Sequence, residues 1–219
     1  MEANTYISKE SRAFTLETKI SDVKKFFNET TFSHFPVVQN KQLIGLISET
    51  DIQVIDSANE DIGMYRNLLL HFYGFEDHNL LELVHIFATN EANLIPIITT
   101  NHEYLGYYDL IDILKIYSDS PFLNDEGTIL QLEKDLNHYA LSEICQIIES
   151  NKGKVLGVYI ADSNETSVKI TLKFSSPDVN ETIQTFRRYD YNVLTKHKED
   201  FYLEDLEDRS NYLRKYLNI

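Results

Sequence analysis

One segment of this chain occurs twice, at an offset of 60 residues that sets Pro96 on Pro36. The first copy includes HFPVVQNKQLIGLISETDI at residues 34–52, and the second runs LLELVHIFATNEANLIPIITTNHEYLGYYDLIDIL at residues 80–114. The offset also sets four apolar residues of the second copy, Leu80, Leu83, Ile86 and Phe87, on Ile20, Val23, Phe26 and Phe27. A repeat of this kind predicts one supersecondary unit built twice, with the two units packed as a pseudo-symmetric pair.

Each repeat is expected to contain a helix, a hairpin and a second helix. Residues 20–27 place apolar side chains at helical spacing. Residues 35–38 and 43–47 are short apolar runs around a polar turn, which is typical of two paired strands. Ser48 then suits the N-cap of the next helix. In the second repeat one extra residue in the turn brings Gly106 onto Gly45 and Asp112 onto Asp51.

Ser48 and Asp51 are the first candidates for ligand binding. A chain that leaves a strand at a glycine and starts a helix at a hydroxyl residue offers free backbone N–H groups, which favour phosphate. Asp51, one turn further along, would accept hydrogen bonds from a ribose diol. The alternative is an ordinary helix cap followed by a solvated aspartate. The short pattern by itself leaves both interpretations open.

The Pro-Val-Val run followed by Gly-Leu-Ile-Ser-Glu-Thr-Asp resembles the core of a CBS domain, a small βαββα module that binds adenosyl ligands in pairs. The resemblance implies that Ser48 and Asp51 hold the phosphate and ribose of AMP, ADP, ATP, S-adenosylmethionine or a related compound. It assigns the remaining ligand-binding positions to the strands and to the second repeat: Phe35, Pro36, Val37, Gly45, Pro96 and Asp112.

The two repeats differ where a phosphate would bind. Asp109 stands in the second repeat where the first has Ser48. An aspartate caps a helix as well as a serine does, but it brings a like charge to a phosphate. We therefore expect the Ser48/Asp51 site to be the better nucleotide site. The second half-site is expected to be empty, to take an uncharged adenosine end, or to depend on a cation.

A polar cluster with a proline at residues 117–121 indicates a domain boundary, because the spacing of apolar residues changes after it. The order of strands and helices from residue 128 to residue 196 is βαββαβ, the ferredoxin-like arrangement. It resembles the ACT type of regulatory domain, which implies a role in dimerisation or signal transmission. The loop at residues 136–139 lacks the glycine usual in amino-acid-binding ACT domains, and Asn137 is expected to cap the following helix.

The predicted organisation is thus of the mixed α/β (α+β) class. Residues 1–119 form a tandem CBS pair, with repeats at about 1–60 and 61–119. Residues 120–200 form the ACT-like domain, and residues 201–219 form a C-terminal helix with an apolar stripe. This order of two CBS-like repeats, an ACT-like domain and a terminal helix resembles that of acetoin-utilisation-type CBS proteins.

Composition excludes several functions. Twenty Lys and Arg against 35 Asp and Glu give a formal net charge of −15, which argues against nucleic acid and anionic membranes as partners. Cys145 is the only cysteine, so we expect neither an intrachain disulfide nor a cysteine zinc site. The chain shows no signal peptide or membrane-spanning run, so a cytoplasmic protein is expected.

No catalytic motif occurs among the seven histidines and the serines, and no phosphate-binding GxxxxGK[ST] loop is present. We therefore predict a regulatory protein without enzymatic activity or cofactor, acting as a homodimer on an enzyme that the sequence does not name. One alternative is an interaction scaffold whose CBS sites are unoccupied. Another is an amino-acid sensor that works through the ACT-like domain.

Overall fold

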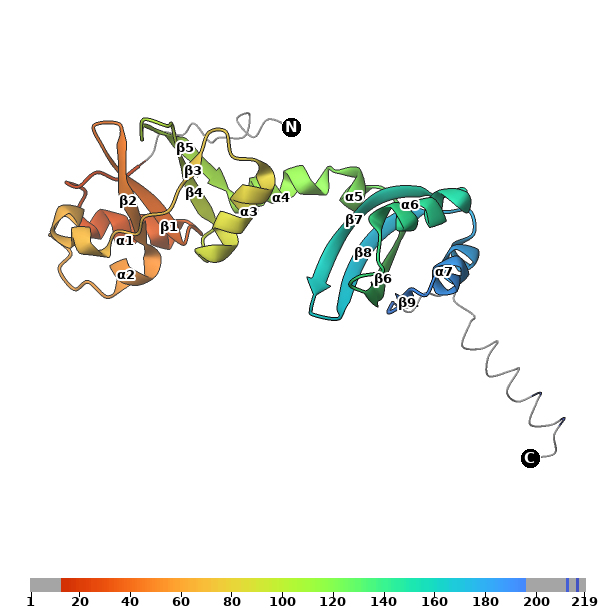
Figure 1. Ribbon diagram of the computed structural model, residues 1–219. Helices are drawn as coiled ribbons and strands as arrows, with labels where there is room; N and C mark the ends of the chain where they lie inside the picture. Colours follow the sequence, from red (N-terminus) through yellow and green to blue (C-terminus); the bar gives the residue numbers. More distant parts are fainter. Residues whose placement is uncertain (1–12, 196–211, 213–215, 217–219) are drawn as a thin grey trace. The chain divides into compact units, whose positions relative to one another are not determined.

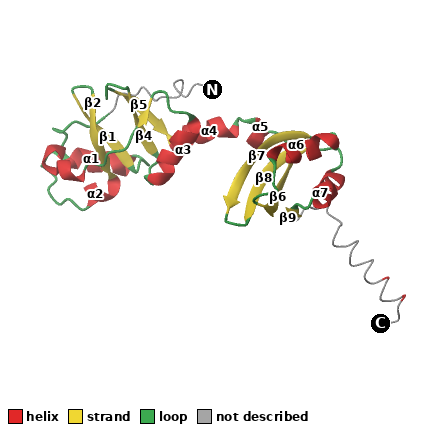
Figure 2. Ribbon diagram, in the orientation of Figure 1, coloured by secondary structure: helices red, strands yellow, loops and turns green. Residues whose placement is uncertain are grey.

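The computed structural model describes residues 13–195 together with Tyr212 and Tyr216. The chain divides into two compact units, Met1–Ser118 and Asp119–Ile219. Figure 1 shows the course of the chain through both units, and Figure 2 shows that each unit contains both helices and strands. The predicted mixed α/β class is confirmed.

The first unit contains the two repeats. Repeat 1 has α1 (Ile20–Glu29), β1 (His34–Gln39), β2 (Gln42–Ser48) and α2 (Glu49–Gln53), followed by a 3-10 segment at Ile62–Leu68. Repeat 2 has β3 (Gly74–Phe75), α3 (Leu80–Thr89), β4 (Leu94–Ile98), β5 (Tyr104–Asp109) and α4 (Leu110–Ser118).

The hairpins of the two repeats share one register. In repeat 1, β1 and β2 pair antiparallel with Pro36 opposite Leu46 and an irregularity after Val37. In repeat 2, β4 and β5 pair antiparallel with Pro96 opposite Tyr107 and an irregularity after Ile97. The predicted repetition is therefore a repetition of structure down to the position of the strand irregularity.

Short strand contacts before each hairpin repeat as well. Phe14 forms a parallel bridge with Val37, and Gly74 of β3 pairs in parallel with Ile97. The first turn owes its tightness to Asn40 and Lys41, which both have positive φ angles of 51° and 65°. Two such residues in succession form the two-residue turn whose twist matches that of a hairpin.

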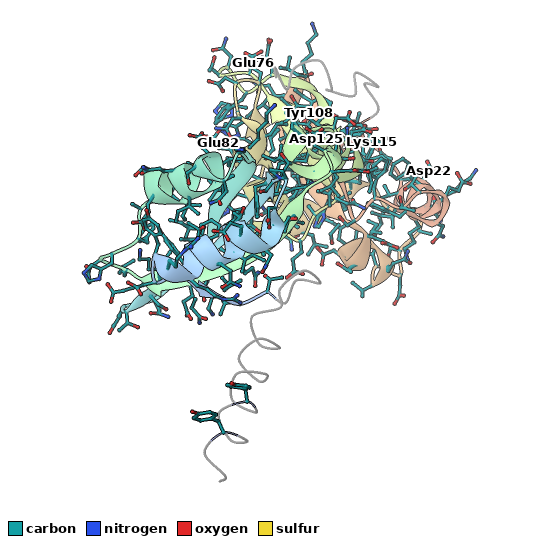
Figure 3. All side chains as sticks on the ribbon, turned by 90° about the vertical axis from the view of Figure 1, so that its right-hand side faces the viewer. Asp22, Glu76, Glu82, Tyr108, Lys115 and Asp125 are labelled. Atoms are coloured by element: carbon teal, nitrogen blue, oxygen red, sulfur yellow. The ribbon has the colours of Figure 1, made fainter. Side chains whose placement is uncertain are left out.

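Each repeat has an apolar core between its helices and strands. In repeat 1, α1 packs against β1 through a cluster of phenylalanine rings, in which Phe26 and Phe35 have centroids 4.2 Å apart. Tyr107 of repeat 2 joins this core. In repeat 2, Tyr108, labelled in Figure 3, is 1% exposed, and burial raises the pKa of Tyr108 to about 12.

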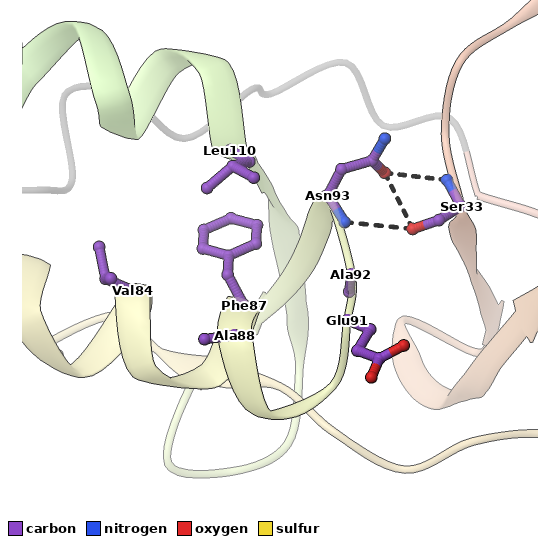
Figure 4. Close-up of a pocket in the computed structure, with 8 residues that line it drawn as sticks. All are labelled: Ser33, Val84, Phe87, Ala88, Glu91, Ala92, Asn93 and Leu110. Carbon is purple, nitrogen blue, oxygen red and sulfur yellow. Dashed lines mark hydrogen bonds between the residues drawn. The ribbon is translucent and has the colours of Figure 1, made fainter.

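Ser33 and Asn93, which occupy equivalent positions in the two repeats, hold the repeats together. The Ser33 N–H donates to Asn93 Oδ1 at 2.9 Å, and the Asn93 N–H donates to Ser33 Oγ at 3.1 Å (Figure 4). The Asn93 side-chain amide also donates to the Thr31 carbonyl at 2.6 Å. Because the pair is reciprocal, the pseudo-twofold axis of the unit passes between these two residues.

The second unit begins with the short helix α5 (Pro121–Asn124). Its strands are β6 (Thr128–Asp135), β7 (Lys154–Ser163), β8 (Ser167–Ser175) and β9 (Asn192–Val193), and its longer helices are α6 (Leu141–Ser150) and α7 (Val179–Arg188). The strands form one antiparallel sheet in the order β7-β8-β6-β9. This is the predicted ferredoxin-like topology, with α6 and α7 contributing Ile144, Ile148 and Phe186 to its core.

One local expectation for the second unit is wrong, and another falls almost entirely outside the described residues. Asn137 does not cap α6, because the helix starts later, with Ala140 as its N-cap, and the Asn137 N–H donates instead to Asp135 Oδ1. The predicted C-terminal helix lies outside the described residues except for Tyr212 and Tyr216. These two residues are helical, with ring centroids 6.3 Å apart.

Replacing Asn93 by Ala should lower the free energy of unfolding of the first unit by about 1–3 kcal/mol, because the partly buried Ser33 N–H loses its acceptor. Chemical denaturation followed by circular dichroism measures this. The control is Asn101→Ala, at an exposed residue whose side chain makes no hydrogen bond within the described chain, and it should change the value by less than about 0.5 kcal/mol. Equal effects of the two variants would contradict the importance of the pair.

Candidate ligand-binding site

Ser48 and Asp51 are brought together at the junction of β2 and α2. Ser48 is the N-cap of α2, and its Oγ accepts a hydrogen bond from the Asp51 N–H at 3.0 Å. The same hydroxyl donates to Asp51 Oδ2 at 2.7 Å. Ser48 is 4% exposed, whereas Asp51 is half-buried. The carboxylate therefore points to the hydroxyl with one oxygen and keeps the other for a further partner.

The backbone amides at the start of α2 are less available than the sequence suggests. The Glu49 N–H donates to the Ser33 carbonyl at 2.9 Å, and the Asp51 N–H donates to Ser48 Oγ. The helix is also only five residues long, so its dipole is small. The polar groups at this place are therefore mainly the Ser48 hydroxyl and the Asp51 carboxylate.

His34 completes the group, because it lies directly opposite Ser48 in the β1–β2 pairing. It is 9% exposed, its Nδ1 lies 2.9 Å from Ser33 Oγ, and its ring meets the Phe72 ring edge-on at 5.4 Å. Burial lowers the pKa of His34 below its ordinary value, and the negative charge of Asp51 opposes this effect. At neutral pH the imidazole is accordingly an uncharged group beside an anionic one.

The strand residues predicted to bind a ligand have different surroundings. Phe35 and Val37 have their side chains in the core of repeat 1, and Pro36 is buried opposite Leu46. Contacts from Phe35 and Val37 to a ligand would therefore come from their backbone.

Gly45 permits a close approach of two chain segments. A Cβ at this position would lie 2.9 Å from Leu69 Cβ and 3.0 Å from the Leu70 carbonyl oxygen. Leu70 forms an antiparallel bridge with Leu46, so residues 69 and 70 run tightly along β2. The glycine thus serves the packing of this segment beside the site.

The equivalent place in repeat 2 has other chemistry. Asp109 Oδ1 accepts a hydrogen bond from the Ile111 N–H at 2.7 Å, as the expected helix cap. Asp112 forms an ion pair with Lys115 at 2.8 Å, and Pro96 is buried in β4. Leu94 replaces His34. Repeat 2 therefore lacks both the hydroxyl and the imidazole that accompany Asp51 in repeat 1.

Phe72 and Ser33 also lie at the candidate site, although neither was among the predicted ligand-binding residues. Phe72 lies in the connection between the repeats, within the aromatic run His71-Phe72-Tyr73. Such a run indicates that some of its rings are buried, but it does not indicate that Phe72 contacts His34. Ser33 stands at the 60-residue offset from Asn93, which indicated equivalence but did not reveal that the two residues would bond each other.

Other types of site are not seen in the described part of the chain. Residues 13–195 contain no cluster of three or more histidine, cysteine or acidic side chains arranged to hold a metal ion. Among the helices described, none is sufficiently long and apolar to cross a membrane. Cys145 is a half-buried free thiol of α6.

These features of repeat 1, a hairpin with a buried proline and a Ser48/Asp51 pair at the following helix, coincide with a family match. Residues 5–55 match the family model of the CBS domain. Repeat 1 therefore carries a CBS domain, as the motif resemblance predicted. Repeat 2 shares the strand register of this CBS domain and has the same order of hairpin and helix.

An uncharacterised protein of Methanocaldococcus jannaschii, MJ0188, is 22% identical to this chain over 138 residues, which are 63% of this chain and 52% of that protein. The chain thus spans about half the length of this curated relative.

Similar solved structures include a CBS domain pair/ACT domain protein from Thermotoga maritima, with a TM-score of 0.47, 12% identity and coverage of 53% of this chain and 96% of that one. The cytosolic domain of the Mg²⁺ channel MgtE, solved with ATP, has a TM-score of 0.44, 20% identity and coverage of 52% and 48%. CBSX2, solved with AMP, has a TM-score of 0.45, 12% identity and coverage of 53% and 95%.

The His34→Leu variant, which introduces the residue that repeat 2 carries, should flatten the dependence of stability on pH. Because burial lowers the pKa of His34 in the folded chain, the unfolded chain binds a proton more readily below about pH 6.5. The contribution of His34 to stability is therefore present above that pH and is lost as the pH falls through its folded pKa. Denaturation between pH 7.5 and 5 measures the slope.

The control for this prediction is His85→Gln, at an exposed position of α3. It should leave the slope of the wild-type chain unchanged. An unchanged slope in His34→Leu would mean that His34 takes up its proton equally well in the folded and unfolded chain.

Proposed function

We propose that the CBS domain of repeat 1 binds an adenine nucleotide or another adenosyl ligand, and that the chain is a non-enzymatic regulator. The observation that carries this proposal is the Ser48–Asp51 pair, a hydroxyl and a carboxylate 2.7 Å apart with a buried histidine opposite. A carboxylate accepts hydrogen bonds from a diol, and a serine hydroxyl donates to a phosphate oxygen.

The aromatic group beside this pair suits the base of the ligand. The His34 and Phe72 rings lie against each other at the same end of the hairpin, and aromatic rings stack on nucleobases. An uncharged His34 also avoids an unpaired positive charge where a neutral adenine would bind. A net charge of −15 over the chain disfavours polyanions, and a single phosphate group requires only a few local donors.

Binding is expected to be asymmetric, with one ligand per chain. In repeat 2 the phosphate would meet Asp109 in place of a hydroxyl, and Asp112 is already paired with Lys115. Like charges at short distance weaken binding. Repeat 2 would accept a ligand only if the ligand were uncharged at that end or a cation accompanied it.

Regulation requires the ligand to prefer one arrangement of the protein over another. Ser33 is placed to sense occupancy, because its hydroxyl bonds His34 while its backbone and hydroxyl bond Asn93 of repeat 2. The ferredoxin-like unit, which we propose to be ACT-like, would transmit the change or join two copies of the chain. The similarity to acetoin-utilisation-type proteins stays a prediction, as does the cytoplasmic location.

One observation favours the alternative of an interaction scaffold. Ser48 and Asp51 satisfy each other without a ligand, and the two nearby amides are already bonded. A ligand must therefore form hydrogen bonds that compensate for the loss of the Ser48–Asp51 hydrogen bond. Thermal-shift measurements with AMP, ATP and S-adenosylmethionine at millimolar concentration distinguish the two functions, because a true site adds stability by mass action and an unused one does not.

The amino-acid sensor is less favoured by the second unit. A pocket of about 470 Å³ lies beside Lys134, Asp135, His138 and Asp190. However, the Lys134 ammonium already bonds Glu143 at 2.8 Å and the Tyr189 carbonyl at 2.9 Å. It has little capacity left for the carboxylate of an amino acid.

Titration calorimetry with AMP and ATP tests the nucleotide site directly. Ser48→Ala and Asp51→Ala should each weaken binding at least about tenfold, because each removes a polar contact to the ligand. Asp112→Ala is the matched control in repeat 2 and should leave the affinity nearly unchanged.

Circular dichroism must accompany the titrations, because losing the Ser48 cap also costs about 1 kcal/mol of stability. Binding that survives both repeat 1 substitutions and is lost in Asp109→Ala would reverse the assignment of the site.

A further inference from the structure

The sheet of the second unit has one face that α6 and α7 do not cover. Leu130 of β6 and Ile170 of β8 belong to the core that these two helices complete. Because side chains alternate along a strand, the residues next to them in the sequence lie on the other side of the sheet. Five residues of that side define what we call the open face: Ile129, Gln131, Tyr159, Thr171 and Leu194.

The register of the sheet sets four of these residues in one row. Thr171 of β8 pairs with Gln131 of β6 and, across its other edge, with Tyr159 of β7. Leu194 extends the row, because its N–H donates to the Gln131 carbonyl at 2.8 Å. Ile129 lies two residues before Gln131 on the same side of β6. The open face is therefore a continuous strip across all four strands.

A short helix already packs beside this strip. The Phe122 ring of α5 fills the space left by Gly157 of β7, where a Cβ atom would overlap with it. The buried ammonium of Lys173 donates to the Leu123 carbonyl of α5 at 3.2 Å. This side of the sheet can thus accept a helical segment of the chain, and α5 covers only the end of it next to the open face.

The open face combines exposed apolar side chains with a buried hydroxyl. Ile129 is 52% exposed and Tyr159 is 51% exposed. Thr171 is only 7% exposed, and its Oγ1 has no hydrogen-bond partner among the described residues. A buried hydroxyl without a hydrogen bond destabilises a fold, and such groups are rare in proteins. Its partner is therefore expected from outside the described residues.

The chain leaves the described part of the second unit at the edge of the open face. The Gln131 N–H donates to Thr195 Oγ1 at 2.8 Å, so residue 196 follows directly beside β6. As a helix, residues 196–219 would be about 36 Å long, whereas four strands are about 14 Å wide. This segment is long enough to cross the open face.

The same segment has an apolar side to bury. Its sequence places four leucines at the spacing of one helix face: Leu203, Leu206, Leu213 and Leu217. Tyr212 and Tyr216, its two described residues, are helical and strongly exposed. An amphipathic helix is stabilised by packing its apolar side against another apolar surface. The open face offers such a surface on the unit to which the segment is attached.

We propose that residues 201–219 dock on the open face of the same chain. The covalent connection gives the segment a high effective concentration at this face, which favours it over a separate partner. The leucines pack on Ile129 and Tyr159, and a polar group of the segment supplies the hydrogen bond that Thr171 lacks. The sheet is then covered on both sides. The proposal does not depend on which ligand binds repeat 1.

Paramagnetic broadening in nuclear magnetic resonance spectra of the full chain tests this contact. A nitroxide label is attached at Asn211→Cys, a position away from the leucines, after the native thiol is removed by Cys145→Ala. The amide signals of Gln131, Tyr159 and Thr171 should lose most of their intensity, and chemical reduction of the label should restore it. Circular dichroism shows that the labelled chain keeps its fold.

The variant Tyr159→Lys should abolish the broadening of the Gln131 and Thr171 signals, because it brings a charge into an apolar contact. The matched control is Tyr189→Lys, at the C-cap of α7, where the tyrosine is 49% exposed. It should leave the broadening unchanged. If Tyr159→Lys does not fold, Ile129→Lys takes its place.

Three results would overturn the proposal. The first is a folded, labelled chain whose open-face signals keep their intensity. The second is an equal loss of broadening in Tyr189→Lys, which would show that the contact is not specific to the open face. The third comes from a mixture of labelled chains with unlabelled, ¹⁵N-enriched chains. Broadening of the enriched chains would show that the segment docks on a second copy.

Discussion

The reciprocal hydrogen bonds between Ser33 and Asn93 are the contact on which the first unit depends. They join the starts of β1 and β4, the strands from which both hairpins extend. The carbonyls of the same two residues accept from Glu49 and Leu110, the first residues of α2 and α4. One pair thus fixes both helix starts, and with them the positions of Ser48 and Asp109. A ligand that disturbs either helix start acts on a junction shared by both repeats.

Much of this arrangement follows from short-range patterns. The hairpin at Pro36 and Gly45 was predictable because two short apolar runs around a polar turn are typical of two paired strands. The repeat then predicted the second hairpin, and the order of apolar segments over residues 128–196 predicted the ferredoxin-like arrangement. What these predictions share is that they depend on local periodicity and on comparison of the chain with itself.

The features that were not predicted depend on contacts between distant segments. The bond between Ser33 and Asn93 could not be inferred, because equivalence at an offset does not imply proximity. The approach of Phe72 to His34 requires the path of the connecting segment. The number of free N–H groups at the start of α2 was overestimated, because the Ser33 carbonyl, just before β1, already accepts a hydrogen bond from one of them. Asn137 was also predicted wrongly. It was expected to cap α6, but its N–H donates a hydrogen bond to Asp135 Oδ1 in a turn before the helix.

Because the two repeats are joined in one chain, each repeat can acquire amino-acid substitutions that the other does not carry. Two separate identical units would carry every substitution twice, so a charge placed at one binding position would also appear at the other. Covalent fusion instead brings unlike units together at a high effective concentration through residues 54–79. Repeat 1 keeps Ser48 and His34 while repeat 2 carries Asp109 and Leu94 at the same places. The fused chain can therefore divide its tasks, because a loss in one half is not copied into the other.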